Sequence, residues 1–344
     1  MGAAAIPQAK QVVRWLPELL CGRLHVLARE LRDLARHGVE TGRIHHVRIA
    51  SRRTRDALDL AQLLPDGHHR LRKFSRRLNR LAETFGPVRD IDVQLPLLQP
   101  DSDGGGNDPR LTPLRDRLRR RLLRWRARET RTLAARLPEA AALAVKLTQL
   151  ERELRCDGLR HHSARKLEKQ VGKAIRADLA TFQKAAAAAK TDPQDATLHR
   201  WRIAVKKLRY RLEALDPLFH SQTSPPPPQP TTRNSQPVAG RAPQPVPSCL
   251  APWIEGLVRL QVWLGQAHDL AVFQTALQRL ATEETTAAAK RGGLRNPLPH
   301  MRLYVKKVFA SEDARKHYLR RNALTLHREA LAPRHWRPLL ELWA

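Results

Sequence analysis

The sequence predicts an all-α protein that contains an internal duplication. Ala, Leu, Arg and Glu recur at three- and four-residue spacings, which place apolar side chains along one face of a helix. Alternating runs of Val, Ile and Thr, which are typical of β-strands, are missing. In addition, one pattern of basic residues occurs twice, at 44–55 and at 198–209.

The helical pattern runs along the chain in segments separated by loop-forming residues. Gly86 and Pro87 indicate that one helix ends there and the next begins, with Asp90 and Asp92 in a first turn where the helix dipole favours acidic groups. Three consecutive glycines predict a loop over 99–109. Helices are expected near residues 17–37, 41–64, 67–85, 88–98, 110–137, 139–154, 158–189, 194–219, 252–264, 267–290 and 311–331.

The longest interruption of the helical pattern covers residues 221–248. It contains four consecutive prolines, five further prolines and almost no large apolar side chains. Such a segment cannot bury enough apolar surface to fold, so we expect a disordered, proline-rich insertion. A ligand for a small adaptor domain is the alternative interpretation of the same composition.

The repeated pattern reads His-x-x-Arg-Ile-Ala-x-basic-basic-x-Arg and starts at His45 and again at His199. Each copy is followed by Gly-x-x-basic-Asp, which starts at Gly86 and at Gly265. The distance from the histidine to the glycine is 41 positions in the first copy and 66 in the second, and the difference of 25 is close to the length of the insertion. We therefore interpret residues 1–344 as one domain with a first half at about 10–155 and a second half at about 156–344.

Each copy of the pattern forms a basic stripe along one side of its helix. On a helical wheel the basic side chains of a copy share about one quarter of the circumference, opposite an apolar face. Regularly spaced cations suit a linear chain of phosphates, and a merely solvated face is disfavoured because like charges at these spacings destabilise a helix. The stripes comprise His45, Arg48, Arg52 and Arg55 in the first copy and His199, Arg202, Lys206 and Arg209 in the second.

The net charge indicates a strongly anionic partner. The chain has 63 Lys and Arg against 33 Asp and Glu, a formal charge of +30, which fits nucleic acid, an acidic membrane surface or a polyphosphate. A polyanion would favour protonated histidines and so link affinity to pH. Arg89 and His268, in the Gly-x-x-basic-Asp elements, could contact the anion, although these elements could equally be simple helix starts. Arg76, on the basic helix that ends at Phe85, could flank the site.

The paired motifs resemble those of the CHAD family, the conserved histidine α-helical domain, over roughly residues 10–285. This resemblance implies two four-helix-bundle-like halves related by a pseudo-two-fold axis around a basic central cavity that binds inorganic polyphosphate, and association with polyphosphate granules. Carried over to the matching positions of this sequence, the resemblance implies that the residues of both stripes contact the anion. It also adds Arg53 and Lys207 to these contacts. The chain departs from the usual pattern in its proline-rich insertion and in Lys206 and Lys207, which stand where arginine is common.

The sequence gives no sign of catalysis, and we expect neither a cofactor nor a metal. No phosphate-binding loop, nucleophile elbow or dinucleotide fingerprint occurs. The segment Glu151–Arg155 only approximates the Glu-x-Glu-x-Lys strand of the triphosphate-cleaving CYTH domains that often accompany CHAD modules, and it lies in a helical stretch. Three scattered cysteines match no metal-ligand or redox spacing, and the paired histidines lack Cys or acidic partners at ligand spacing.

The alternative function is nucleic-acid binding, which the net charge also fits. Against it, aromatic residues make up only 5% of the chain, and Tyr210 alone lies at the edge of a basic stripe, whereas single-strand binders generally provide aromatic stacking platforms. We expect nucleic acid to be a weaker competitor for the site. No apolar run is long enough to span a membrane, and we expect a cytoplasmic protein located on polyphosphate granules.

Overall fold

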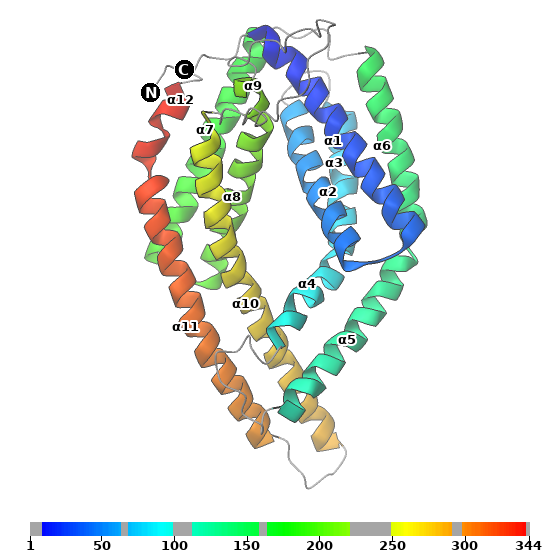
Figure 1. Cartoon of the computed structure of the whole chain (residues 1–344), viewed down its shortest axis with the longest axis vertical. Coiled ribbons are helices and arrows are strands. Elements are labelled where there is room, and N and C mark those ends of the chain that lie inside the picture. Colours follow the sequence, from blue (N-terminus) through cyan, green and yellow to red (C-terminus); the bar gives the residue numbers. More distant parts are fainter. Residues whose placement is uncertain are drawn as a thin grey trace, which may run out of the picture.

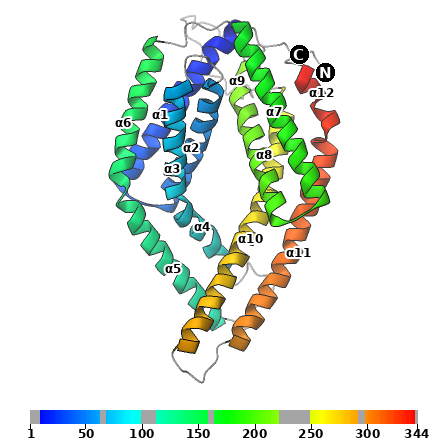
Figure 2. The same cartoon turned by 180° about the vertical axis from the view of Figure 1, so that it is seen from behind.

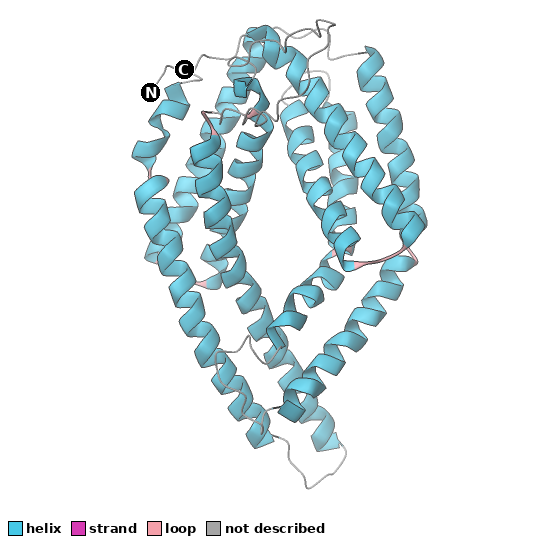
Figure 3. Cartoon of the chain, viewed as in Figure 1, coloured by secondary structure: helices cyan, strands magenta, loops and turns pink. Residues whose placement is uncertain are grey.

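The computed structural model describes residues 9–62, 68–98, 112–157, 164–220, 249–290 and 298–341, and within these ranges the chain is helical without strands (Figure 3). The all-α prediction is therefore confirmed. In chain order the elements are α1 (Ala9–His37), α2 (Thr41–Ala61), α3 (His68–Thr84), α4 (Gly86–Gln94), the 3-10 helix η1 (Leu95–Leu98), α5 (Thr112–Ala134), α6 (Leu137–Asp157), α7 (Ala164–Thr191), α8 (Asp195–Leu215), α9 (Pro217–His220), α10 (Ala251–Lys290), α11 (Leu298–Ala330), the 3-10 helix η3 (Pro333–Trp336) and α12 (Arg337–Glu341).

Several predicted helix boundaries were wrong, and the first helix begins at Ala9 rather than near residue 17. The break expected between residues 264 and 267 is absent, because α10 runs through Gly265 without interruption. A single glycine only weakens a helix, by about 1 kcal/mol relative to Ala, whereas Pro87 lacks the N–H that would continue α3 into α4. The last long helix begins at Leu298 rather than near 311. The expected loop over 99–109 and the insertion over 221–248 lie outside the described residues.

The helices form two groups that lie side by side (Figure 1). In the first group, which we call the N-terminal helices (α1–α6), α1 packs on α2 and α6, and α3 packs on α2. In the second, the C-terminal helices (α7–α12), α8 packs on α7 and α10, and α10 packs along α11. Each group therefore contains one copy of the repeated motif, on α2 and on α8.

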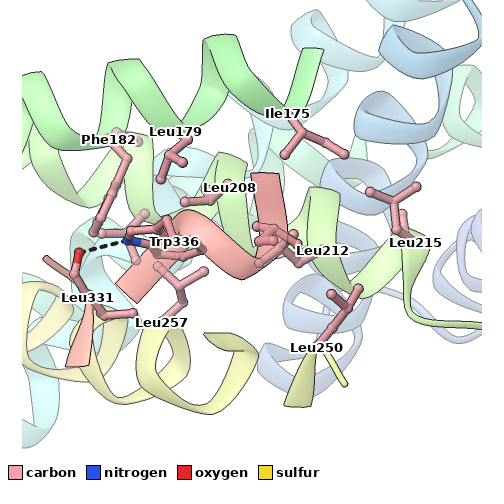
Figure 4. Close-up of a cluster of buried hydrophobic side chains, with 14 of the residues drawn as sticks. Ile175, Leu179, Phe182, Leu208, Leu212, Leu215, Leu250, Leu257, Leu331 and Trp336 are labelled. Carbon is pink, nitrogen blue, oxygen red and sulfur yellow. Dashed lines mark hydrogen bonds between the residues drawn. The ribbon is translucent and has the colours of Figure 1, made fainter. Parts of the chain in front are cut away.

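The core of the C-terminal helices is closed by the end of the chain. Trp336 of η3 is fully buried and packs edge-on against Phe182 of α7, with ring centroids 5.8 Å apart. Its indole Nε1 donates a hydrogen bond to the carbonyl oxygen of Leu331 at 2.8 Å, so the polar atom of this large side chain has a partner (Figure 4). Apolar side chains of α7, α8 and α10, including Leu257, surround the ring.

Apolar contacts join the two groups at two separate places. Near one end of the molecule, Trp15 of α1 is buried and donates from Nε1 to the carbonyl oxygen of Ala214 on α8, at 2.9 Å. Where α4 meets α10 (Figure 2), Ile91 of α4 belongs to the same buried cluster as Phe273 of α10. The helix pairs α2–α8 and α4–α10 also contact each other. In the part of the chain that the structure describes, no helix is long and apolar enough to cross a membrane.

Candidate functional site

The two motif helices are held in place by their apolar faces. On α2 the buried side chains include Ile44, Val47 and Leu58, and on α8 they include Trp201 and Leu208, all with at most 1% of their surface exposed. The sequence pattern predicted these apolar faces. Their burial fixes the rotation of each helix, so that the basic stripe on the other side is turned towards the space between the two groups.

A pocket of about 490 Å³ opens between α2, α4, α8 and α10, and we call it the basic pocket. It brings together eight of the predicted site residues from positions far apart in the sequence. Val93, Gln94 and Gln261, which the sequence did not single out, also line it. The eight predicted residues are His45, Arg48, Arg52, Arg89, His199, Arg202, Lys206 and His268.

The motif glycines lie beside the first arginine of each stripe. A Cβ atom added at Gly86 would lie 4.0 Å from Nη1 of Arg48, and one added at Gly265 would lie 3.8 Å from Nε of Arg202. Arg48 also donates from Nη1 to the carbonyl oxygen of Ala82 at 3.2 Å, in the last turn of α3, where carbonyl groups lack intrahelical partners. Both distances are ordinary van der Waals contacts, so each glycine lies directly against the guanidinium group of the arginine that it accompanies.

Two carboxyl groups of these elements, Asp90 and Asp269, also line the basic pocket. Burial raises the pKa of both, and this effect is opposed most strongly by Arg48 for Asp90 and by Arg202 for Asp269. Each carboxylate is thus electrostatically coupled to the arginine beside the glycine of its own element. Asp92 instead turns to α5, where it accepts a hydrogen bond from Nε of Arg126 at 2.5 Å.

A pair of histidines lies at the α8–α10 side of the basic pocket. Nδ1 of His199 is 3.2 Å from Nδ1 of His268, and the ring centroids are 4.4 Å apart. One ring must donate a proton and the other must accept it, so both cannot carry a full positive charge without repulsion. Burial, followed by Arg202, lowers the pKa of His268 to about 4, and burial also lowers the pKa of His199 and of His45.

Lys206 is the most strongly perturbed cation of the basic pocket. Burial, followed by repulsion from Arg202 and Arg52, lowers its pKa to about 7. The amine of Lys206 is therefore only partly protonated at neutral pH when no anion is bound. An anion in the pocket would offset the repulsion and restore the charge.

The other predicted residues lie outside the basic pocket, and three of them form ion pairs. Nη2 of Arg53 lies 3.5 Å from Oε2 of Glu213, and Nη1 of Arg209 lies 3.1 Å from Oε1 of the same residue. Nζ of Lys207 lies 2.9 Å from Oδ1 of Asp178. These carboxylates neutralise the flanks of the motif helices and leave the pocket side positive.

Arg55 and Arg76 also lie outside the basic pocket, one at a neighbouring pocket and the other on the exposed surface of α3. Arg55 lines a smaller adjoining pocket of about 300 Å³, together with Arg48 and Arg52, and it donates to Oδ1 of Asn79. Arg76 is exposed on α3 and lines neither of these two pockets.

Asp178, a buried carboxylate on α7, was not among the residues predicted from the sequence. It accepts from Nε of Arg211 at 2.9 Å, and both side chains are less than 10% exposed. One signal was present in the sequence, because Asp178 lies at helical spacing from Ile175 and Phe182 on the buried face of its helix. A charged residue in such a stripe indicates a buried partner.

Comparisons with known proteins identify the family and the fold of the chain. A family model, the CHAD domain, matches residues 18–226. A solved structure, the crystal structure of the CHAD domain from the plant Ricinus communis, is similar with a TM-score of 0.54 and 22% sequence identity, over 94% of this chain and 93% of that chain. At this identity the likeness shows the fold alone. No curated protein matches the sequence.

Proposed function

The chain belongs to the CHAD domain family, and we propose from this premise that its basic pocket binds inorganic polyphosphate without catalysis. The observation that carries the proposal is the meeting of both motif copies at one pocket. Arg48 and Arg52 reach it from α2, and Arg202 and Lys206 reach it from α8. We further propose that this binding directs the protein to polyphosphate granules in the cytoplasm.

The chemistry of the pocket suits a flexible chain of phosphates. Arginine offers a planar fork of donors to phosphate oxygens, and lysine offers a mobile point charge. Four arginines and Lys206 face two carboxyl groups, whose pKa values are raised, so the pocket carries net positive charge. Each phosphate bound would release counterions, and we therefore expect affinity to fall steeply as salt rises.

The lining of the basic pocket favours polyphosphate over single-stranded nucleic acid. Among the described residues that line it, none is Phe, Tyr or Trp, so bases find no stacking platform there. Tyr210, at the edge of the second stripe, is 7% exposed and lies beneath the guanidinium of Arg209, 4.5 Å from the ring centroid. Its ring is therefore already covered.

Direct competition tests the choice of polymer. Long-chain polyphosphate should displace single-stranded DNA and RNA from the protein at equal phosphate concentration and about physiological salt. Fluorescence anisotropy with labelled nucleic acid measures the displacement. If DNA or RNA displaces polyphosphate instead, the nucleic-acid function holds and the polyphosphate proposal is wrong.

Neutralising the pocket tests the site. We expect the Arg48→Gln, Arg52→Gln, Arg202→Gln and Lys206→Gln quadruple variant to lose at least about 100-fold in polyphosphate affinity, since each tenfold loss needs only about 1.4 kcal/mol. The matched control removes the same charge from the exposed face of α5. It carries Arg119→Gln, Arg120→Gln, Arg124→Gln and Arg131→Gln. Equal losses in the two variants, with helicity unchanged in both by circular dichroism, would place binding in the overall charge rather than in the pocket.

A further inference from the structure

A second pocket, which we call the α3–α6 pocket, lies within the N-terminal helices. It measures about 550 Å³ and shares no lining residue with the basic pocket. It arises because α3 packs on α2 while α6 packs on α1, which leaves a hollow between α3 and α6. Leu133 and Arg136, near the junction of α5 and α6, complete its wall.

The mouth of the α3–α6 pocket is positively charged. Arg77, Arg80, Arg136 and Lys146 line it together with a single carboxylate, Glu139. The last three of these cations are exposed, and none of the four forms an ion pair with a described carboxylate. By contrast, many other arginines have acidic partners, as at the 2.5 Å contact between Arg126 and Asp92. Four positive charges and one negative charge thus line this pocket, which leaves it with net positive charge.

The wall of the α3–α6 pocket is apolar. Phe85, Leu133 and Leu143 line it, are at most 8% exposed, and belong to the core of the N-terminal helices. Leu81 and Leu137 add partly buried apolar surface. A purely ionic ligand such as polyphosphate would leave this surface uncovered, whereas an alkyl chain would cover it.

We propose that the α3–α6 pocket binds an amphipathic anion with one phosphate or carboxylate head group and an alkyl body. The head group would accept charge-assisted hydrogen bonds from arginines at the mouth, such as Arg80 and Arg136. The alkyl body would lie against Phe85 and Leu143. The size of the pocket is typical of small-molecule sites, which are mostly apolar with a few convergent polar groups. This inference does not rest on the polyphosphate proposal, because the two pockets are lined by different residues.

Calorimetric titration of the full chain tests the ligand class. Dodecyl phosphate and dodecanoate, each below the concentration at which it forms micelles, represent the two possible head groups. We expect one-to-one binding of at least one of them. Dodecyltrimethylammonium and inorganic phosphate should bind at least tenfold more weakly, because the first lacks the negative charge and the second lacks the apolar body. Equal affinity for inorganic phosphate would show that the apolar wall is not used and would overturn the proposal.

Variants at the pocket locate the binding. Arg80→Glu combined with Arg136→Glu should weaken dodecyl phosphate binding at least tenfold, and Ala142→Trp should do the same by filling the pocket from an exposed position in its wall. The matched control is Arg120→Glu combined with Arg124→Glu, which makes the same charge change on exposed positions of α5. An equal loss in the control would contradict the proposal. So would tighter binding of an acidic amphipathic helical peptide that displaces dodecyl phosphate, since the pocket would then be a protein-docking site.

Discussion

The N-terminal and C-terminal helices contribute different cations to the basic pocket. The α2 side presents Arg48 and Arg52, whose guanidinium groups stay charged at any physiological pH. The α8 side adds Lys206, with a pKa of about 7, and the closely spaced rings of His199 and His268. The difference teaches that both sides supply permanent charge, since Arg202 lies on α8, whereas the cation that can gain or lose charge near neutral pH, Lys206, lies on the α8 side.

The two groups also differ in how their cores are closed. In the C-terminal helices, Trp336 is fully buried and Leu331 packs so closely on Gly256 that an added Cβ would lie 3.2 Å from it. In the N-terminal helices, Phe85 and Leu143 instead line the α3–α6 pocket. The segment that contains Leu331 and Trp336 fills the core of the C-terminal helices, whereas a pocket remains beside the core of the N-terminal helices.

Removing the closing tryptophan should have the largest effect. We expect Trp336→Ala to lower the free energy of unfolding by about 3–5 kcal/mol, because it leaves a large internal cavity. Leu143→Ala should lower it by only about 2 kcal/mol, since water can enter the enlarged α3–α6 pocket. Urea denaturation followed by circular dichroism measures both values. A loss for Leu143→Ala as large as that for Trp336→Ala would show that the two cores are equally closed.

The pH dependence of polyphosphate binding should come mainly from the α8 side. Bound anion raises the pKa of Lys206 from about 7 towards its ordinary value, so binding takes up a proton when the pH is above 7. Affinity should therefore fall as pH rises from 7 to 9, by up to about tenfold per pH unit for one proton. Lys206→Arg should flatten this fall, because arginine stays charged. Equal slopes for the two proteins in titrations at fixed salt would assign the pH dependence to other groups.

The smallest expected effect concerns the two motif glycines. Gly265 lies inside the continuous helix α10, and its added Cβ would make only ordinary contact with Arg202, so Gly265→Ala should raise the free energy of unfolding by about 0.5–1 kcal/mol. Gly86 is the first residue of α4, where less helix is gained, and Gly86→Ala should change stability by less. Thermal unfolding compares the variants. A destabilised Gly265→Ala would show that α10 needs flexibility at this point.

The sequence predicted most helices and the inward faces of α2 and α8, because periodic apolar residues report on burial locally. It wrongly predicted a helix break at Gly265, because Gly265 and Gly86 occupy the same motif position but only Gly86 is followed by a proline. That single N–H group decides whether the helix continues. The internal duplication, the pseudo-two-fold relation of the halves and the anion-binding roles of the thirteen predicted residues remain predictions.

The composition and the repeated motif were enough to indicate an anionic partner and to single out the eight predicted residues that line the basic pocket, since charge and spacing can be read along a helix. Only the tertiary structure decided which of the predicted cations form ion pairs with carboxylates and which line the basic pocket. Arg53 and Arg209 meet Glu213, and Lys207 meets Asp178, because helix packing brings these carboxylates to the flanks of the motif helices. The depressed pKa of Lys206 likewise needs burial beside cations from another helix, and no local pattern in the sequence encodes that proximity.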